Sequence, residues 1–186
     1  GMSDLTPLEV ADSVAVVTGG ANGIGRGIVR GLLEAGATVV VADIEQDVLD
    51  ATVAALSASH PGRITGVVTN VIDDASTDAL ADHVYATHGR CNLLFNNAGV
   101  GSGGGGRMWT HEPNDWRWCY SVNVFGVANG VMSFVGRMLD SGEPGHVVNT
   151  SSGDGGFAPV PNAAVYASSK AAVSCLTEAL AHQLAE

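Results

Sequence analysis

The chain has 186 residues, of which 46% are hydrophobic and only 15% are charged, and its formal net charge is −11. This composition predicts a folded domain with a sizeable core and excludes a disordered chain, while the negative charge disfavours nucleic acid and anionic membranes as partners. Three widely spaced cysteines and six histidines without metal-ligand spacing disfavour a disulfide framework and predict no metal site.

Short apolar runs alternate with longer helical patterns along the chain. The predicted strands are Val14–Thr18, Thr38–Ala42, Ile64–Thr69, Asn92–Asn96 and His146–Thr150. The predicted helices are Gly23–Ala35, Gln46–Ala58, Asp74–His88, roughly Pro113–Leu139, and one that carries Tyr166. The continuous run Val39–Val41 is typical of a strand covered on both faces. Repeated strand–helix–strand order with right-handed crossovers predicts an α/β fold with a doubly wound parallel sheet of order 3-2-1-4-5.

A glycine-rich turn, Thr18–Gly25, directly follows the first predicted strand and opens the first predicted helix. Gly19, Gly23 and Gly25 allow a tight turn and let the backbone approach a phosphate with no Cβ in the way. The free N–H groups and the dipole of the helix start then face an anion. The turn is therefore interpreted as a cradle for a dinucleotide pyrophosphate, and the alternative is a turn that binds nothing.

Asp43 ends the second predicted strand, eighteen residues after Gly25. A carboxylate there can accept hydrogen bonds from both hydroxyls of an adenosine ribose, and it repels a 2′-phosphate. No Arg or Lys lies in Gly20–Asn22 or directly after Asp43 to offset that repulsion. The sequence therefore favours NAD over NADP. The alternative is that Asp43 only caps the following helix.

Tyr166 and Lys170 lie four residues apart in a predicted helix, so their side chains project from the same face about one turn apart. A neighbouring ammonium favours the phenolate form of a tyrosine, which can then exchange a proton with a substrate. A proton carrier and a dinucleotide cradle in one chain point to hydride transfer. The alternatives are a buried tyrosine bonded to backbone and a solvated lysine.

Four motifs in this order resemble the short-chain dehydrogenase/reductase family, in its classical branch. They are Thr18-Gly-x-x-x-Gly-x-Gly25, Asn96-Asn97-Ala98-Gly99, Asn123 in Val122–Val124, and Tyr166-x-x-x-Lys170. The resemblance implies a Rossmann-type fold, a nicotinamide cofactor, and oxidation of an alcohol or reduction of a carbonyl.

The same resemblance implies roles for individual residues. Tyr166 is the expected general acid/base, Lys170 its activator and a ligand of the nicotinamide ribose, Ser152 the group that orients the substrate oxygen, and Asn123 the holder of a proton-relay water. The residues expected to bind the cofactor are Gly19, Asn22, Gly23, Ile24, Gly25, Asp43, Asn70, Val71, Asn97, Ala98, Gly99, Tyr166 and Lys170.

Three features depart from the family pattern. Ser152 lies one residue further from Tyr166 than in the family, with Ser151 as the fallback, and Asn70-Val71 stands where the family often has Asp-Val. The chain also stops inside the helix that carries Tyr166. We therefore expect residues 1–186 to form one domain, truncated at the C-terminus, without the sixth and seventh strands of the family.

The sequence thus predicts a cytoplasmic NAD-dependent oxidoreductase acting on a secondary alcohol or ketone. No basic and apolar leader pattern and no apolar stretch near the ~20 residues that span a bilayer are apparent. The helices Trp116–Leu139 and Tyr166 onward resemble subunit-contact helices of the family, so a homo-oligomer, dimer or tetramer, is expected. The alternatives are a non-catalytic dinucleotide-binding protein and an NADPH-preferring carbonyl reductase.

Overall fold

The computed structural model describes residues 7–101, 106–150 and 161–186. In these ranges every predicted strand and helix is present, and no predicted end differs from the observed one by more than one residue. The strands are β1 (Val14–Thr18), β2 (Thr38–Asp43), β3 (Ile64–Val68), β4 (Leu93–Asn96) and β5 (His146–Asn149). The helices are α1 (Gly23–Glu34), α2 (Gln46–Ser57), α3 (Asp74–His88), α4 (Pro113–Tyr120), η2 (Ser121–Phe125), α5 (Gly126–Asp140) and α7 (Ala164–Leu184), with a short 3-10 turn η1 (Met108–Thr110).

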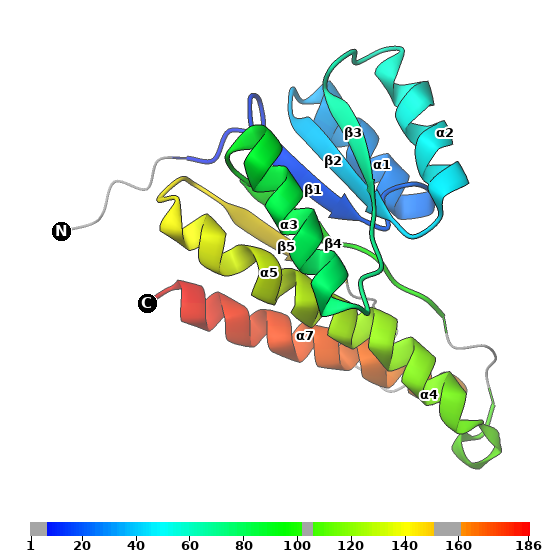
Figure 1. The fold of residues 1–186 in the computed structure, drawn as a ribbon. Coiled ribbons are helices and arrows are strands. Elements are labelled where there is room, and N and C mark those ends of the chain that lie inside the picture. Colours follow the sequence, from blue (N-terminus) through cyan, green and yellow to red (C-terminus); the bar gives the residue numbers. More distant parts are fainter. Residues whose placement is uncertain (1–6, 102–105, 151–160) are drawn as a thin grey trace.

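The five strands form one parallel sheet of order β3-β2-β1-β4-β5 (Figure 1). The predicted fold class and strand order are therefore confirmed. This order places the chain reversal between β1 and β4, so the carboxyl ends of these two strands flank a crevice in which doubly wound sheets bind their ligands.

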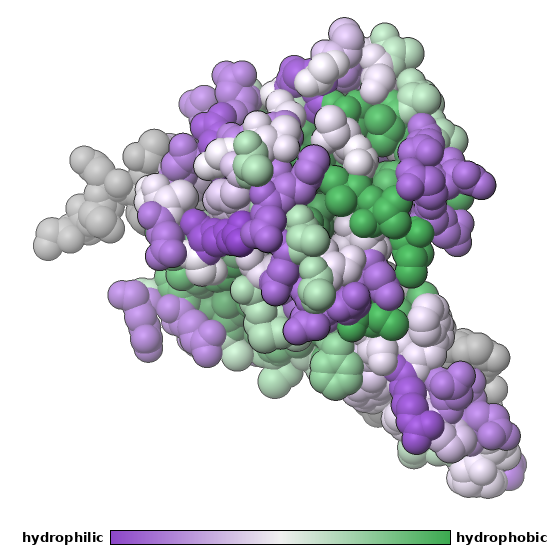
Figure 2. All heavy atoms as spheres, in the orientation of Figure 1, coloured by the Kyte–Doolittle hydropathy of each residue, from purple (hydrophilic) through white to green (hydrophobic). Residues whose placement is uncertain are grey.

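The middle of the sheet is covered on both faces, as the apolar run in β2 predicts. Val39 and Val41 pack with side chains of α1 and α2 on one face, and Val40 packs with side chains of α3 and α5 on the other. The edge strand β3 is more open: Figure 2 shows hydrophobic residues at the surface in this region, where Val68 is 47% exposed.

The predicted helix Pro113–Leu139 is one continuous path with a wider π-helical turn, η2, between α4 and α5. Pro113 occupies the first turn, where no backbone donor is needed. By length and mean hydropathy alone, Pro113–Asp140 could cross a membrane, which the sequence pattern did not indicate. However, 56% of its most apolar window is buried inside the structure, as in the core helix of a folded domain.

Candidate active site

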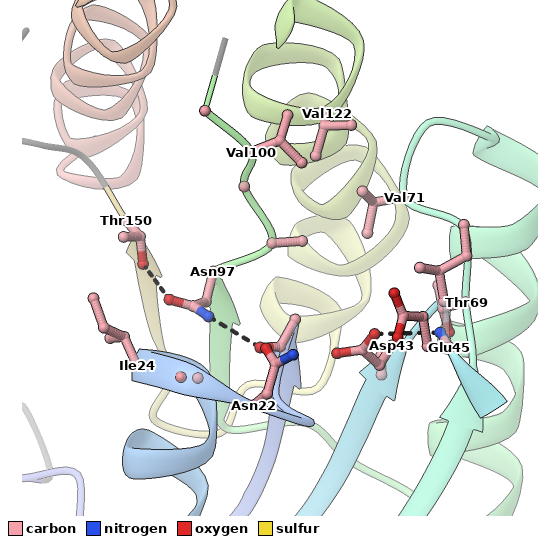
Figure 3. A pocket seen from close by; sticks show the side chains of 18 of the residues that line it. Asn22, Ile24, Asp43, Glu45, Thr69, Val71, Asn97, Val100, Val122 and Thr150 are labelled. Atoms are coloured by element: carbon pink, nitrogen blue, oxygen red, sulfur yellow. Dashed lines mark hydrogen bonds between the residues drawn. The ribbon is translucent and has the colours of Figure 1, made fainter. Parts of the chain in front are cut away.

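A pocket of about 550 Å³ opens at the carboxyl ends of the strands (Figure 3). Its lining includes all thirteen residues that were predicted to bind the cofactor. Segments far apart in the sequence meet here: the turn after β1, the ends of β2, β3 and β4, and the start of α7. Ser152 and its fallback Ser151 lie outside the described residues.

The glycines of the turn after β1 meet two different needs. Gly19 has φ +61°, and a Cβ there would lie 2.8 Å from the Ala98 Cα. A Cβ on Gly25 would collide with the carbonyl oxygen of Gly19. Gly23 has φ +55° and open space around it. The protein's own backbone thus requires Gly19 and Gly25, and only Gly23 presents a free surface to a ligand.

The first turn of α1 faces the same pocket without a side-chain cap. Asn22 precedes the helix in an extended conformation, and its side chain makes no capping hydrogen bond. The N–H groups of a first helical turn have no intrahelical partner and attract anions. Among the described lining residues the charged ones are Asp43, Glu45 and Lys170. Beside the glycine turn, the positive potential therefore comes from the N-terminal end of α1.

The Asp43 carboxylate is held at the end of β2 by two backbone groups. Its Oδ2 accepts from the Ala21 N–H at 3.1 Å, and its Oδ1 accepts from the Glu45 N–H at 3.3 Å. Glu45 precedes α2, and its own side chain makes no capping hydrogen bond. Asp43 therefore links the glycine turn to the residue that precedes α2, and its contact with Glu45 agrees in part with the capping alternative drawn from the sequence.

An apolar wall faces Asp43 across the same end of the pocket. Val71, Val100 and Val122 come from three separate segments and gather in Figure 3 above the end of β2. Asn70 lies beside this wall, and its Oδ1 accepts from the Ile72 N–H at 3.3 Å. A carboxylate beside an apolar wall suits an adenosine group, because the ribose hydroxyls can donate to Asp43 while the adenine packs against the valine side chains.

Two threonines that the sequence reasoning missed organise the floor of the pocket. Thr18 Oγ1 accepts from the N–H groups of Asn97 and Ala98 at 3.0 and 3.1 Å. Thr150 Oγ1 donates to Asn97 Oδ1 at 3.0 Å, and Asn97 Nδ2 donates to the Gly19 carbonyl at 3.3 Å. The available signal was positional, because both threonines end or follow strands at the ligand-binding edge.

Tyr166 and Lys170 lie on one face of α7 in its first turns, and both line the pocket. The Lys170 ammonium lies 5.8 Å from the centroid of the Tyr166 ring and donates to the Thr150 carbonyl at 3.4 Å. Lys170 is only 5% exposed, so the solvated lysine considered as an alternative is excluded. Burial lowers the pKa of the Lys170 ammonium below its ordinary value.

Asn123 sits behind the pocket, fully buried in the π-helical turn η2. Its amide pairs with both backbone groups of Val100: Oδ1 accepts from the N–H at 2.7 Å and Nδ2 donates to the carbonyl at 2.8 Å. Nδ2 also lies 3.1 Å from Ser169 Oγ and 3.3 Å from Cys119 Sγ. The Asn123 side chain thus fixes the segment after β4, and its predicted hold on a relay water stays a prediction.

The family model of the short chain dehydrogenases matches residues 13–186. The chain belongs to this family. The motifs, the strand order and the pocket agree with this assignment, and the fold is of the Rossmann type.

Relatives show how much of a short-chain dehydrogenase is present. The C alpha-dehydrogenase of Sphingobium sp. strain SYK-6 is 40% identical over 175 residues, which are 91% of this chain and 55% of that protein. A short-chain dehydrogenase/reductase from Burkholderia phymatum, solved with NAD, has a TM-score of 0.90 and 42% identity, and covers 95% of this chain and 62% of that one. The chain therefore spans little more than half the length of these relatives.

A further solved structure widens the choice of cofactor. A metagenomic short-chain oxidoreductase in complex with NADP has a TM-score of 0.86 and 33% identity, and covers 95% of this chain and 78% of that one. The fold therefore holds a nicotinamide dinucleotide, and both NAD and NADP occur among its neighbours. The preference of this chain for NAD or NADP must therefore be argued from its own residues.

Proposed function

We propose that this chain forms the dinucleotide-binding and catalytic part of an NAD-dependent dehydrogenase, which transfers a hydride between NAD(H) and a secondary alcohol or its ketone. The observation that carries the proposal is that the glycine turn, Asp43 and the Tyr166–Lys170 pair all line one pocket. The turn and Asp43 alone would support binding only. A proton carrier in the same pocket supports chemistry on a bound substrate and disfavours the non-catalytic alternative.

The residues present fit a dinucleotide. Open space at Gly23 and the uncapped start of α1 suit the pyrophosphate, Asp43 suits the adenosine ribose, and Lys170 suits the nicotinamide ribose. When bound, the nicotinamide ring supplies the hydride acceptor or donor.

The chain's own residues handle the proton. The phenolic oxygen of Tyr166 takes the hydroxyl proton when an alcohol is oxidised, and it gives the proton back when a ketone is reduced. Lys170 lies beside this proton carrier, and the Thr150 carbonyl holds the ammonium close to the Tyr166 ring. Ser152 orients the substrate oxygen in this proposal.

The preference for NAD rests on the charge at the adenosine end of the pocket. Asp43 and Glu45 both line it, and the described lining there holds no Arg or Lys that could neutralise a 2′-phosphate. A phosphate beside two carboxylates is repelled, whereas two ribose hydroxyls can donate to Asp43. This arrangement argues against the NADPH-preferring reductase.

Assembly and location are also part of the proposal. Phe125, Met132 and Leu139 are large apolar side chains that are exposed along η2 and α5. A homo-oligomer that covers this helix surface together with α7 would remove them from water. We place the protein in the cytoplasm on the basis of its composition and reduced cysteines.

The test is a fluorescence titration of the purified protein with NADH and NADPH. Saturable NADH binding with much weaker NADPH binding supports the proposal, and binding of neither contradicts it. Asp43→Ala is expected to weaken NADH about tenfold and narrow the gap to NADPH, because hydrogen bonds to a charged acceptor are lost. Asp47→Ala, which removes an equal charge from the exposed surface of α2, is the matched control and should leave both affinities unchanged. Unchanged discrimination in Asp43→Ala would rule out the ribose assignment.

A further inference from the structure

Thr150 joins the glycine turn to the catalytic lysine through two different groups. Its hydroxyl donates to Asn97 Oδ1 at 3.0 Å, and its carbonyl accepts from Lys170 Nζ at 3.4 Å. Asn97 Nδ2 continues the chain to the Gly19 carbonyl at 3.3 Å, and a dashed line in Figure 3 marks the contact between Thr150 and Asn97. Thr150, Asn97 and Gly19 follow β5, β4 and β1, which are neighbours in the sheet. The contacts therefore run across the sheet edge beneath the pocket.

The Gly19 carbonyl, which can only accept, directs the Asn97 amide nitrogen toward itself, and the Thr150 hydroxyl holds that orientation by donating to Oδ1. An asparagine side chain has an acceptor oxygen and a donor nitrogen of nearly equal shape, so its orientation depends on its partners. Backbone carbonyls are normally paired in a folded protein, and the Gly19 carbonyl accepts from Asn97 Nδ2 at 3.3 Å. When Thr150 donates to Oδ1 of Asn97, Nδ2 of Asn97 faces the Gly19 carbonyl and donates to it.

We propose that Thr150 is a positioning residue for dinucleotide binding, which orients Asn97 and through it the backbone of the glycine turn. This inference rests on the proposed function, because the turn is taken to hold the pyrophosphate. Peptide groups are planar, so a tilt of the Gly19 carbonyl also turns the N–H of Gly20 and shifts the start of α1. Without the hydroxyl, the turn should populate other orientations and bind the dinucleotide less tightly.

The two groups of Thr150 can be separated by mutation. Thr150→Val keeps the shape and the carbonyl that contacts Lys170, and it removes only the hydroxyl. The expected effect is therefore larger on affinity for the dinucleotide than on turnover at saturating cofactor. A general loosening of the structure around Tyr166 and Lys170 would lower kcat as much as affinity. Thr150→Ser keeps the hydroxyl and serves as the conservative rescue.

The experiment measures the NADH dissociation constant, the KM for NAD and kcat for wild type, Thr150→Val and Thr150→Ser. The loss of one neutral hydrogen bond predicts about fivefold weaker NADH binding and a matching rise in KM for Thr150→Val. Thr150→Ser should bind close to wild type, and in Thr150→Val kcat should fall by a smaller factor than KM rises. Equal NADH affinity in wild type and Thr150→Val, equal weakening in both variants, or a fall of kcat as large as the rise of KM would each overturn the inference.

A second variant keeps the test decisive if Thr150→Val does not fold. Asn97→Asp still accepts from Thr150 but cannot donate to the Gly19 carbonyl, so it should also weaken NADH binding. In the double variant the two losses should not add, because both break the same chain of contacts; additive losses count against the proposal. A wild-type protein that binds no NADH would instead contradict the proposed function, which keeps the two failures distinct.

Discussion

Strand β2 and the first turns of α7 both border the pocket and both are partly buried, but the buried side chains of β2 are apolar whereas those of α7 include polar ones. Val39, Val40 and Val41 of β2 are 0% exposed and apolar. Ser169 and Lys170 of α7 are 0% and 5% exposed and polar. Apolar burial is favourable for any close-packed shape, whereas a buried polar group is tolerated only when its partners are in place.

This difference separates stability from function. The β2 region fixes the sheet, and with it the positions at which the ligand-binding loops begin. In the proposed reaction, the α7 region supplies the reacting groups Tyr166 and Lys170, and Lys170 is costly to bury. We therefore expect substitutions in β2 to lower stability, and substitutions in the first turns of α7 to lower activity while stability is kept or raised.

The largest expected effect lies in the α7 region. Tyr166→Phe removes the proton carrier and leaves the ring that packs beside Lys170. Turnover should fall about 10³-fold, within the usual range for the loss of a general acid/base. NADH affinity, measured by fluorescence titration, should stay within a few-fold of wild type, as should the melting temperature. A variant that retains most of its turnover would show that another group moves the proton.

The converse effect is expected in β2. Val40→Ala removes two methyl groups from a fully buried site between α3 and α5 and should lower the free energy of unfolding by about 2 kcal/mol. The matched control is Val68→Ala in edge strand β3, where the side chain is 47% exposed and the loss should stay below about 0.5 kcal/mol. Urea unfolding measures both. Equal losses at the two sites would contradict the view that β2 carries the core.

The same contrast explains what the sequence could predict. The apolar runs and the glycine turn leave local patterns, so the strand ends and the strand order could be derived from them, whereas most of the residues predicted to bind the cofactor came from the resemblance to the family. The side chain of Asn123 holds the backbone of Val100, 23 residues away, a contact that the sequence reasoning did not predict. No periodicity reveals such a contact.

Two other features were not predicted from the sequence, for related reasons. The π-helical turn at Ser121–Phe125 depends on how the long helix packs, and its residues look like any other helical stretch. Thr150 looks like the last residue of a strand, and its role becomes visible only when β5 is placed beside β4. Polar contacts across a sheet edge are a property of the tertiary fold, so the sequence alone did not distinguish Thr150 from its neighbours.

The smallest expected effect is the most specific to the α7 region. Lys170 is the only lysine of the sequence, and burial lowers the pKa of its ammonium below 10.5. Between that lowered pKa and 10.5 the unfolded chain binds more protons than the folded one, so this group makes wild-type stability rise with pH in that window. Below the window the folded protein bears the full cost of a buried charge.

Lys170→Met should therefore unfold at a higher urea concentration than wild type at pH 7, by up to about 1 kcal/mol, while its turnover is lost. The difference should shrink as the pH approaches 10.5, because the wild-type lysine then loses its charge in both states. Cys91 and Tyr85, whose pKa values burial raises to about 12, lower the stability of both proteins above about pH 9 and cancel in the difference. Arg30→Met on the exposed surface of α1 is the control and should show no such gain. A less stable Lys170→Met at pH 7 would mean that the contacts of the ammonium outweigh the cost of its burial, and that the two regions differ less than their composition implies.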